Sequence, residues 1–125
     1  MKVDVSLGEL VDKVTILAIK SERIAEPEKL KNILKEFEIL KGAMNSAGIN
    51  TESPEYRRLY KINSRLWDIE DAIRGKEAAK NFDGDFIELA RSVYFNNDER
   101  AAVKREINIR YGSELVEEKS YRSYK

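Results

Sequence analysis

The stretch SPEYRRLYKINSRLWDIEDAIR, residues 53–74, decides the fold of this chain. Its branched apolar residues recur at spacings of three and four: Leu59, Ile62, Leu66, Ile69 and Ile73. In an α-helix this spacing places all five side chains on one face. Ser53 followed by Pro54 is typical of a helix start. We therefore expect a central helix from Pro54 to about Ala79 with this face buried.

A second row runs along the same helix, one residue later and at the same spacing: Tyr60, Asn63, Trp67, Glu70 and Arg74. The row is too polar for a plain core edge and too aromatic for a plain solvent face. One interpretation is a ligand site, with five candidate residues: Asn63, Trp67, Glu70, Asp71 and Arg74. The other is a buried polar network, in which Trp67 belongs to the core and Asn63 fixes the helix register.

Two further helices precede this one. Ser6 and Glu9 have the spacing of a capping box, which predicts that the first helix begins there. Pro27 ends that helix and suits the first turn of the next. The second helix carries its own stripe, at Leu30, Ile33, Phe37, Leu40 and Met44. The very short connection favours an antiparallel pair of helices.

The remaining sequence predicts two more helices. The turn sequence NFDGD, residues 81–85, precedes a short helix that includes Phe86 and Val93. Residues 96–98, NND, are expected to break the pattern and start a fifth helix, which ends at Gly112. The prediction is an all-α antiparallel helical bundle of about five helices with coiled-coil-like packing. It forms a single domain over residues 1–125, with a C-terminal tail, residues 113–125, partly docked or mobile.

Composition excludes several kinds of chemistry. Charged residues make up 37% and hydrophobic residues 42% of the 125-residue chain, which favours long amphipathic helices. The chain contains no cysteine and no histidine, so thiol nucleophiles, imidazole bases and thiolate zinc sites are impossible within it. No cofactor is predicted. Magnesium is the one alternative, held by Glu70 together with Glu88 or Glu106.

The charges balance, with 23 basic and 23 acidic residues and a formal net charge of zero. Nucleic acid is therefore an unlikely partner, because no global field attracts it. The tail still interleaves bases and aromatics, at Lys119, Tyr121, Arg122, Tyr124 and Lys125, as single-strand contacts do. No apolar run has the length of a signal peptide or membrane span, so we expect a cytoplasmic protein with no membrane partner.

The first helix suggests two other features. Asp12, Lys13, Lys20 and Arg23 lie along it, and the helix is loosely similar to one in the bundle-type chorismate mutases, which implies an Arg/Lys pocket for a small dicarboxylate. The plainer interpretation is that these are surface charges with buried stems. Ile16 and Ile19 lie off the main apolar stripe, which suggests an additional neighbour, such as a second subunit.

Five segments together resemble a family of small bacterial and phage proteins with no assigned function. They are GELVDKVTIL (8–17), LWDIEDAIR (66–74), FIELARSVY (86–94), NDERAAVKREIN (97–108) and GSELVEEKSY (112–121). The resemblance covers nearly the whole chain. It implies a small helical protein and supplies no activity, cofactor or catalytic residue.

Three functions follow as expectations, in this order. The first is a helical interaction or structural module that forms a homo-oligomer or binds another protein. The second is a bundle enzyme that processes a small molecule or nucleotide in a carboxylate-magnesium or Arg/Lys pocket. The third is a nucleic-acid-binding module that uses the C-terminal tail.

Overall fold

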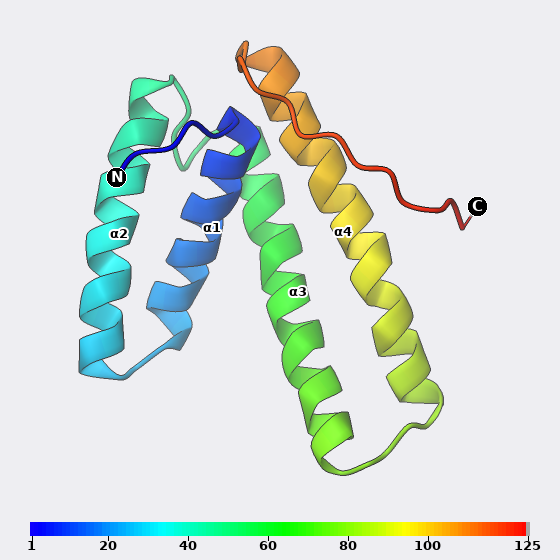
Figure 1. Cartoon of the computed structure of the whole chain (residues 1–125). Helices are drawn as coiled ribbons and strands as arrows, with labels where there is room; N and C mark the ends of the chain where they lie inside the picture. Colours follow the sequence, from blue (N-terminus) through cyan, green and yellow to red (C-terminus); the bar gives the residue numbers. More distant parts are fainter. Residues whose placement is uncertain (125) are drawn as a thin grey trace.

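The computed structural model describes residues 1–124 and is all-α, with four helices. The helices are α1 (Leu7–Arg23), α2 (Pro27–Ser46), α3 (Pro54–Ala78) and α4 (Gly84–Arg110). Figure 1 shows them as two hairpins, α1 with α2 and α3 with α4. The last tail residue, Lys125, lies outside the described residues.

The prediction of five helices is wrong, because α4 continues through the expected break at residues 96–98. Asn96 satisfies its side chain inside the helix, donating from Nδ2 to the carbonyl oxygen of Ser92 at 2.8 Å. Asparagine and aspartate cost a helix only about 0.7 kcal/mol each relative to alanine. Packing of α4 against α1 and α3 outweighs this local preference.

The predicted cap at Ser6 and the predicted helix end at Gly112 are confirmed, and the structure adds a cap at Asp83. The Ser6 hydroxyl accepts a hydrogen bond from the Glu9 amide at 3.1 Å, and Asp83 caps α4 by accepting from the Phe86 amide at 2.9 Å. Gly112 follows α4 with a φ of +67°, which suits glycine. The Glu9 carboxylate, however, does not complete the capping box and instead binds Lys104 on α4, at 2.7 Å.

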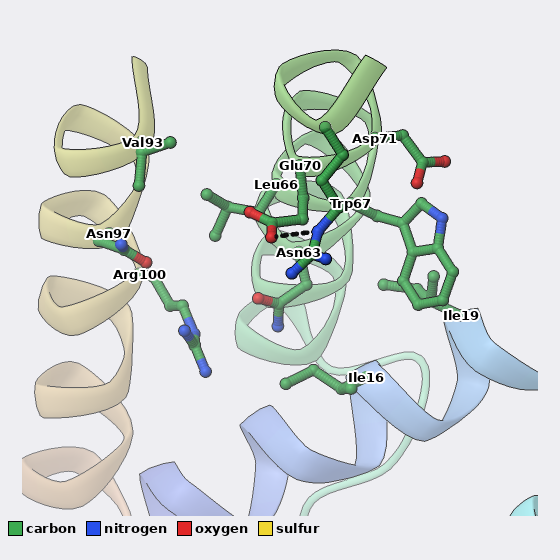
Figure 2. A pocket seen from close by; sticks show the side chains of 11 residues that line it. Ile16, Ile19, Asn63, Leu66, Trp67, Glu70, Asp71, Val93, Asn97 and Arg100 are labelled. Carbon is green, nitrogen blue, oxygen red and sulfur yellow. Dashed lines mark hydrogen bonds and ion pairs between the residues drawn. The ribbon is translucent and has the colours of Figure 1, made fainter. Parts of the chain in front are cut away.

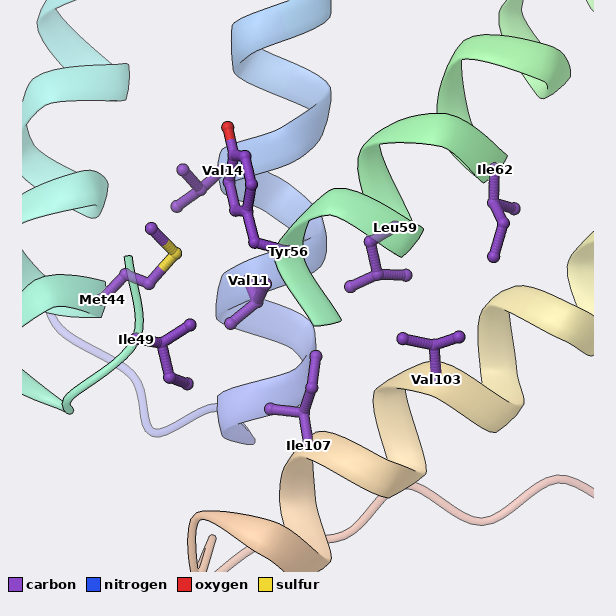
Figure 3. Close-up of a cluster of buried hydrophobic side chains, with 9 residues drawn as sticks. All are labelled: Val11, Val14, Met44, Ile49, Tyr56, Leu59, Ile62, Val103 and Ile107. Atoms are coloured by element: carbon purple, nitrogen blue, oxygen red, sulfur yellow. The ribbon is translucent and has the colours of Figure 1, made fainter. Parts of the chain in front are cut away.

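Helix α1 is central, because it packs against each of the other three helices. The hydrophobic core lies where all four meet (Figure 3) and consists of Val11, Val14, Met44, Ile49, Tyr56, Leu59, Ile62, Val103 and Ile107. The predicted apolar face of α3 is therefore only partly buried. Leu59 and Ile62 lie in this core, whereas the later members of the stripe are half-buried.

The lower half of the α3–α4 hairpin has no third helix over it. Figure 1 shows the hairpin tip extending well past the connection between α1 and α2. From Ser64 to Ala102 no residue is buried, although this segment contains Leu66, Ile73, Phe86 and Val93. Two helices alone cover only the stripe along which they touch, so their apolar sides stay accessible to water.

Helices α1 and α4 approach very closely at Gly8. A Cβ atom on Gly8 would lie 2.4 Å from the carbonyl oxygen of Lys104. The Gly8 amide also donates to the Asn108 side chain on α4, at 2.7 Å. Any larger residue at position 8 must push the two helices apart.

We expect Gly8→Ala to lower the free energy of unfolding by about 2–3 kcal/mol, because the methyl group meets backbone that cannot move independently. Urea denaturation measures the change. Gly42→Ala is the matched control, since nothing lies within 4 Å of its added Cβ atom. That control should stabilise α2 by about 0.5–1 kcal/mol. Equal stability of the two variants would contradict the close approach.

Candidate functional site

A buried polar centre joins α1, α3 and α4. Asp12 on α1 is only 1% exposed and receives two hydrogen bonds from Arg100 on α4, from Nε at 2.9 Å and from Nη2 at 2.5 Å. Asn63 on α3 donates from Nδ2 to Asp12 at 2.9 Å and to the Thr15 hydroxyl at 2.8 Å. Among residues 1–124 no buried side-chain nitrogen or oxygen lacks a partner. The centre is therefore fully satisfied.

The electrostatics of this centre keep the Arg100 guanidinium charged. The hydrogen bond to Asp12 holds the pKa of Arg100 above its ordinary value, although burial of the guanidinium opposes the shift. The arginine therefore keeps its charge at every pH at which the protein is folded. Arg100 can therefore orient helices and hold a neighbour, but it does not serve as a proton donor.

A cavity of about 470 Å³ lies beside the polar centre, between α1, α3 and α4 (Figure 2). Its apolar walls are Ile16, Ile19, Leu66, Trp67 and Val93. Its polar lining consists of Asn63, Glu70, Asp71, Arg74, Asn97 and Arg100. All five candidate residues therefore line one cavity: four from the polar row, and Asp71 beside it. Their binding of a ligand remains a proposal.

The five residues have different environments. Asn63 is buried in the polar centre. Trp67 is half-buried and therefore not a core residue; the Arg23 guanidinium lies 5.7 Å from the centroid of its ring. Glu70 and Arg74 are exposed and paired to each other at 2.8 Å, one helical turn apart, while Asp71 is exposed beside them. Only the inner end of the row thus belongs to a buried network, and its outer end forms the rim of the cavity.

The sequence-based reasoning missed Arg100, which completes the polar centre. The signal that could have revealed it is a polar row on α4 at helical spacing: Asn97, Arg100, Lys104 and Asn108. This row faces α1, as shown by the bonds from Arg100 to Asp12, from Lys104 to Glu9 and from Asn108 to Gly8. The predicted break at residues 96–98 concealed it, because the row spans that position.

The other predicted charge clusters are not assembled. Lys13 lies 3.9 Å from Glu36 of α2, and Arg23 lies 2.5 Å from Asp68 of α3, so the cations of α1 do not converge on a dicarboxylate pocket with Lys20.

The carboxylates proposed for magnesium each pair with an arginine. Glu88 pairs with Arg91 at 2.9 Å, and Glu106 pairs with Arg58 at 2.8 Å. In the described part of the chain no three acidic side chains are grouped so that they could hold a metal ion. Over residues 1–124, none of the helices combines the length and the apolar character needed to cross a membrane.

The second apolar flank of α1 is covered by the chain itself. Ile19 is 1% exposed, and Ile16 is half-buried at the cavity between α1, α3 and α4. Ile19 thus needs no second subunit to cover it, whereas Ile16 stays partly accessible, and a second subunit remains a prediction.

A second charged cluster ties the C-terminal tail to α1 and α4. Lys104 is buried and donates to Glu9 at 2.7 Å and to Glu117 of the tail at 3.1 Å. Its hydrogen bond lowers the pKa of the Glu117 carboxyl, and a second bond from Lys119 adds to the shift. Glu118 of the tail pairs with Arg105 at 2.8 Å. Two carboxylates of the tail thus pair with cations of α4.

The fold and the polar centre define a class: small all-helical proteins built from two packed hairpins that share a buried ion pair. A family model described as a family of unknown function (DUF6165) matches residues 1–124, and the chain belongs to this family. Among curated proteins and among solved structures, none matches the chain.

We expect Arg100→Met to lower the free energy of unfolding by about 3–5 kcal/mol, because it leaves the buried Asp12 carboxylate without its cation. Asp12→Asn should cost less, about 1–3 kcal/mol, since Arg100 reaches water and can hydrate its charge. Adding Asp12→Asn to Arg100→Met should recover stability. Arg58→Met, which breaks an exposed pair, is the control and should cost at most about 1 kcal/mol. If chemical denaturation gave Arg58→Met and Arg100→Met the same loss in free energy of unfolding, the ion pair of the polar centre would not have the importance assigned to it.

The tail should detach from α4 on acidification. The pKa of Glu117 in the folded protein lies below the ordinary glutamate value of 4.5. Its ion pair therefore stabilises the docked tail fully only at a pH above 4.5. This stabilisation disappears as the pH falls from 4.5 through the lowered pKa. NMR chemical shifts of residues 117–124 measure the release. Glu117→Gln should loosen the residues around position 117 already at neutral pH, whereas Glu114→Gln should not; unchanged shifts around position 117 in Glu117→Gln would refute this anchor.

Proposed function

We propose that this protein is a helical interaction module that self-associates through the lower half of the α3–α4 hairpin. The observation that supports this proposal is the absence of any buried residue from Ser64 to Ala102, in a segment whose helices carry apolar stripes. We define the uncovered face as Phe86, Ile87, Ala90 and Val93 of α4 with Leu66 of α3. Ile87 is 55% exposed, and such apolar faces typically mark protein contacts.

The geometry of α1 explains why the face is open. Its contacts with α4 begin at Gly8 and Asn108 and continue through Asp12 and Arg100. Near its C-terminal end α1 bonds instead to α3, through Glu22 to Tyr60 and Arg23 to Asp68. The first turns of α4 are therefore left without the neighbour that covers the later turns.

A second copy of this chain is the partner that fits best. Two copies of a two-helix hairpin can together form a four-helix bundle. The hairpins of two copies of this chain have the same length, so they match along the whole contact. The chain has no net charge, so copies do not repel each other at long range. Glu70 and Arg74, one turn apart at the rim, can exchange partners between antiparallel copies related by a two-fold axis.

The cavity of the polar centre belongs to the same contact. Leu66 and Val93 line the cavity and form part of the uncovered face, so the cavity opens next to the proposed interface. An apolar side chain of the second copy would fill it. The candidate residues Asn63, Trp67, Glu70, Asp71 and Arg74 are, in this proposal, the floor and rim of a protein-binding site.

A small molecule in this cavity is the second candidate. Its volume of about 470 Å³ falls within the range of ligand pockets, and its walls combine apolar side chains with a few polar groups. A ligand of this kind would shift the emission of Trp67, the only tryptophan, without changing the oligomeric state. Screening for such shifts separates the two candidates.

We expect the wild-type protein to dimerise and Ala90→Arg to be monomeric, because the new side chain places a charge in the middle of the uncovered face. Ala90 is already exposed, so the variant should fold normally. Ala102→Arg is the control, on the same helix and also exposed, but pointing away from this face. Analytical ultracentrifugation over a wide concentration range measures the association. A wild-type monomer at all concentrations, or equal effects of both variants, would overturn the proposal.

A further inference from the structure

A second cavity, of about 940 Å³, lies between α4 and the C-terminal tail. Four lining residues come from α4, namely Tyr94, Asn97, Asp98 and Arg100, and five from the tail, namely Lys119, Tyr121, Arg122, Ser123 and Tyr124. In Figure 1 the tail runs back beside α4 as an extended chain. This cavity shares Asn97 and Arg100 with the first cavity, and it shares no lining residue with the uncovered face.

The tail is anchored on both sides of this cavity. Before the cavity, Glu117 and Glu118 pair with Lys104 and Arg105. After it, the Tyr124 hydroxyl donates to Asp98 at 2.5 Å, and the Tyr124 ring packs 4.9 Å from that of Tyr94. The hydrogen bond to Asp98 raises the pKa of Tyr124 to about 12, so this phenol stays neutral. Between these anchors the tail forms the outer wall of the cavity.

Among the charged residues of the lining, three are cationic and one is acidic. Arg100, Lys119 and Arg122 approach from both walls, and the single acidic lining residue, Asp98, already accepts the Tyr124 hydroxyl. Arg100 uses Nε and Nη2 on Asp12, which leaves Nη1 for a ligand. Arg122 forms no ion pair with any residue in the described part of the chain. Such a lining attracts a negatively charged group, and arginine suits phosphate in particular.

Three tyrosine rings lie in or beside this cavity and could contact a ring of a ligand. Tyr94 and Tyr124 pack together, and Tyr121 is 79% exposed, with the Lys119 ammonium 5.5 Å from its ring centroid. Exposed aromatic rings beside cations are the platform on which nucleotide bases stack. Asn97 adds an amide that can pair with a base edge. The volume exceeds what a bare phosphate or small dicarboxylate would fill, and it accommodates a ring together with a phosphate.

We propose that the cavity between α4 and the C-terminal tail binds a nucleotide, with Arg122, Lys119 and Arg100 around the phosphate and Tyr121 stacked on the base. The same chemistry is offered by a free mononucleotide and by a nucleotide within a single strand. Because the uncovered face shares none of its residues, this site and self-association can be tested with different variants.

The test compares four probes on the full chain: AMP, adenosine, inorganic phosphate and a short single-stranded oligonucleotide. Isothermal titration calorimetry gives affinities, and NMR shifts of residues 119–124 locate the binding. We expect AMP to bind at least tenfold more tightly than adenosine or phosphate, because it engages both the cations and the ring. An oligonucleotide that binds at least tenfold more tightly than AMP identifies the single strand as the source, and equal affinity identifies the free nucleotide.

Variants on the surface of the tail keep the fold intact. Arg122→Gln and Tyr121→Leu should each weaken AMP binding about tenfold, which corresponds to about 1.4 kcal/mol. Arg57→Gln, an exposed arginine far along the chain, is the charge-matched control and should bind as the wild type does. Ala90→Arg should also bind normally, which separates this site from self-association. No AMP binding, phosphate binding as tight as that of AMP, or equal loss in Arg57→Gln would overturn the proposal.

Discussion

The buried carboxylate of Asp12 is the constraint on which the arrangement of the helices depends. A charge that is 1% exposed must be paired, and here the partner comes from α4 while a further hydrogen bond comes from Asn63 of α3. Helix α1 can therefore occupy only one register against the α3–α4 hairpin. The close approach at Gly8 reinforces this register one turn earlier. Such a pair adds little net stability compared with apolar side chains, and its main effect is to select one packing.

The position of α1 also decides where the molecule is incomplete. Helix α1 lies against the upper half of the hairpin, and the chain then continues into α2. Helices α3 and α4 therefore extend below α1 as an uncovered pair (Figure 1). The first cavity lies at the edge of this boundary, where Ile16 and Ile19 of α1 face Leu66 and Trp67 of α3 (Figure 2). Both the cavity and the accessible apolar face therefore arise because α1 does not contact the first turns of α4.

Helix α4 carries two different kinds of surface. Below its contact with α1, it presents the apolar side chains of the uncovered face, which suit a helical partner. Beside the tail, the lining includes tyrosines and cations, which suit an anionic ligand with a ring. Arg100 lines both cavities and donates two hydrogen bonds to Asp12. With neither histidine nor cysteine in the chain, neither surface can perform imidazole or thiol chemistry.

Local signals in the sequence determined where helices begin and which side chains share a face. Ser6, Pro27, Pro54 and Asp83 mark helix starts because capping and proline geometry act within a few residues. Asn63, Trp67 and Glu70 meet in one cavity because they follow one helix, so their grouping needed no tertiary information. The tertiary structure alone decided three things. It kept α4 continuous through residues 96–98, because packing outweighs a small propensity cost. It paired Asp12 with Arg100, since their meeting depends on how two distant helices cross. It also left the lower part of the α3 stripe half-buried, because burial depends on how far α1 reaches along the hairpin.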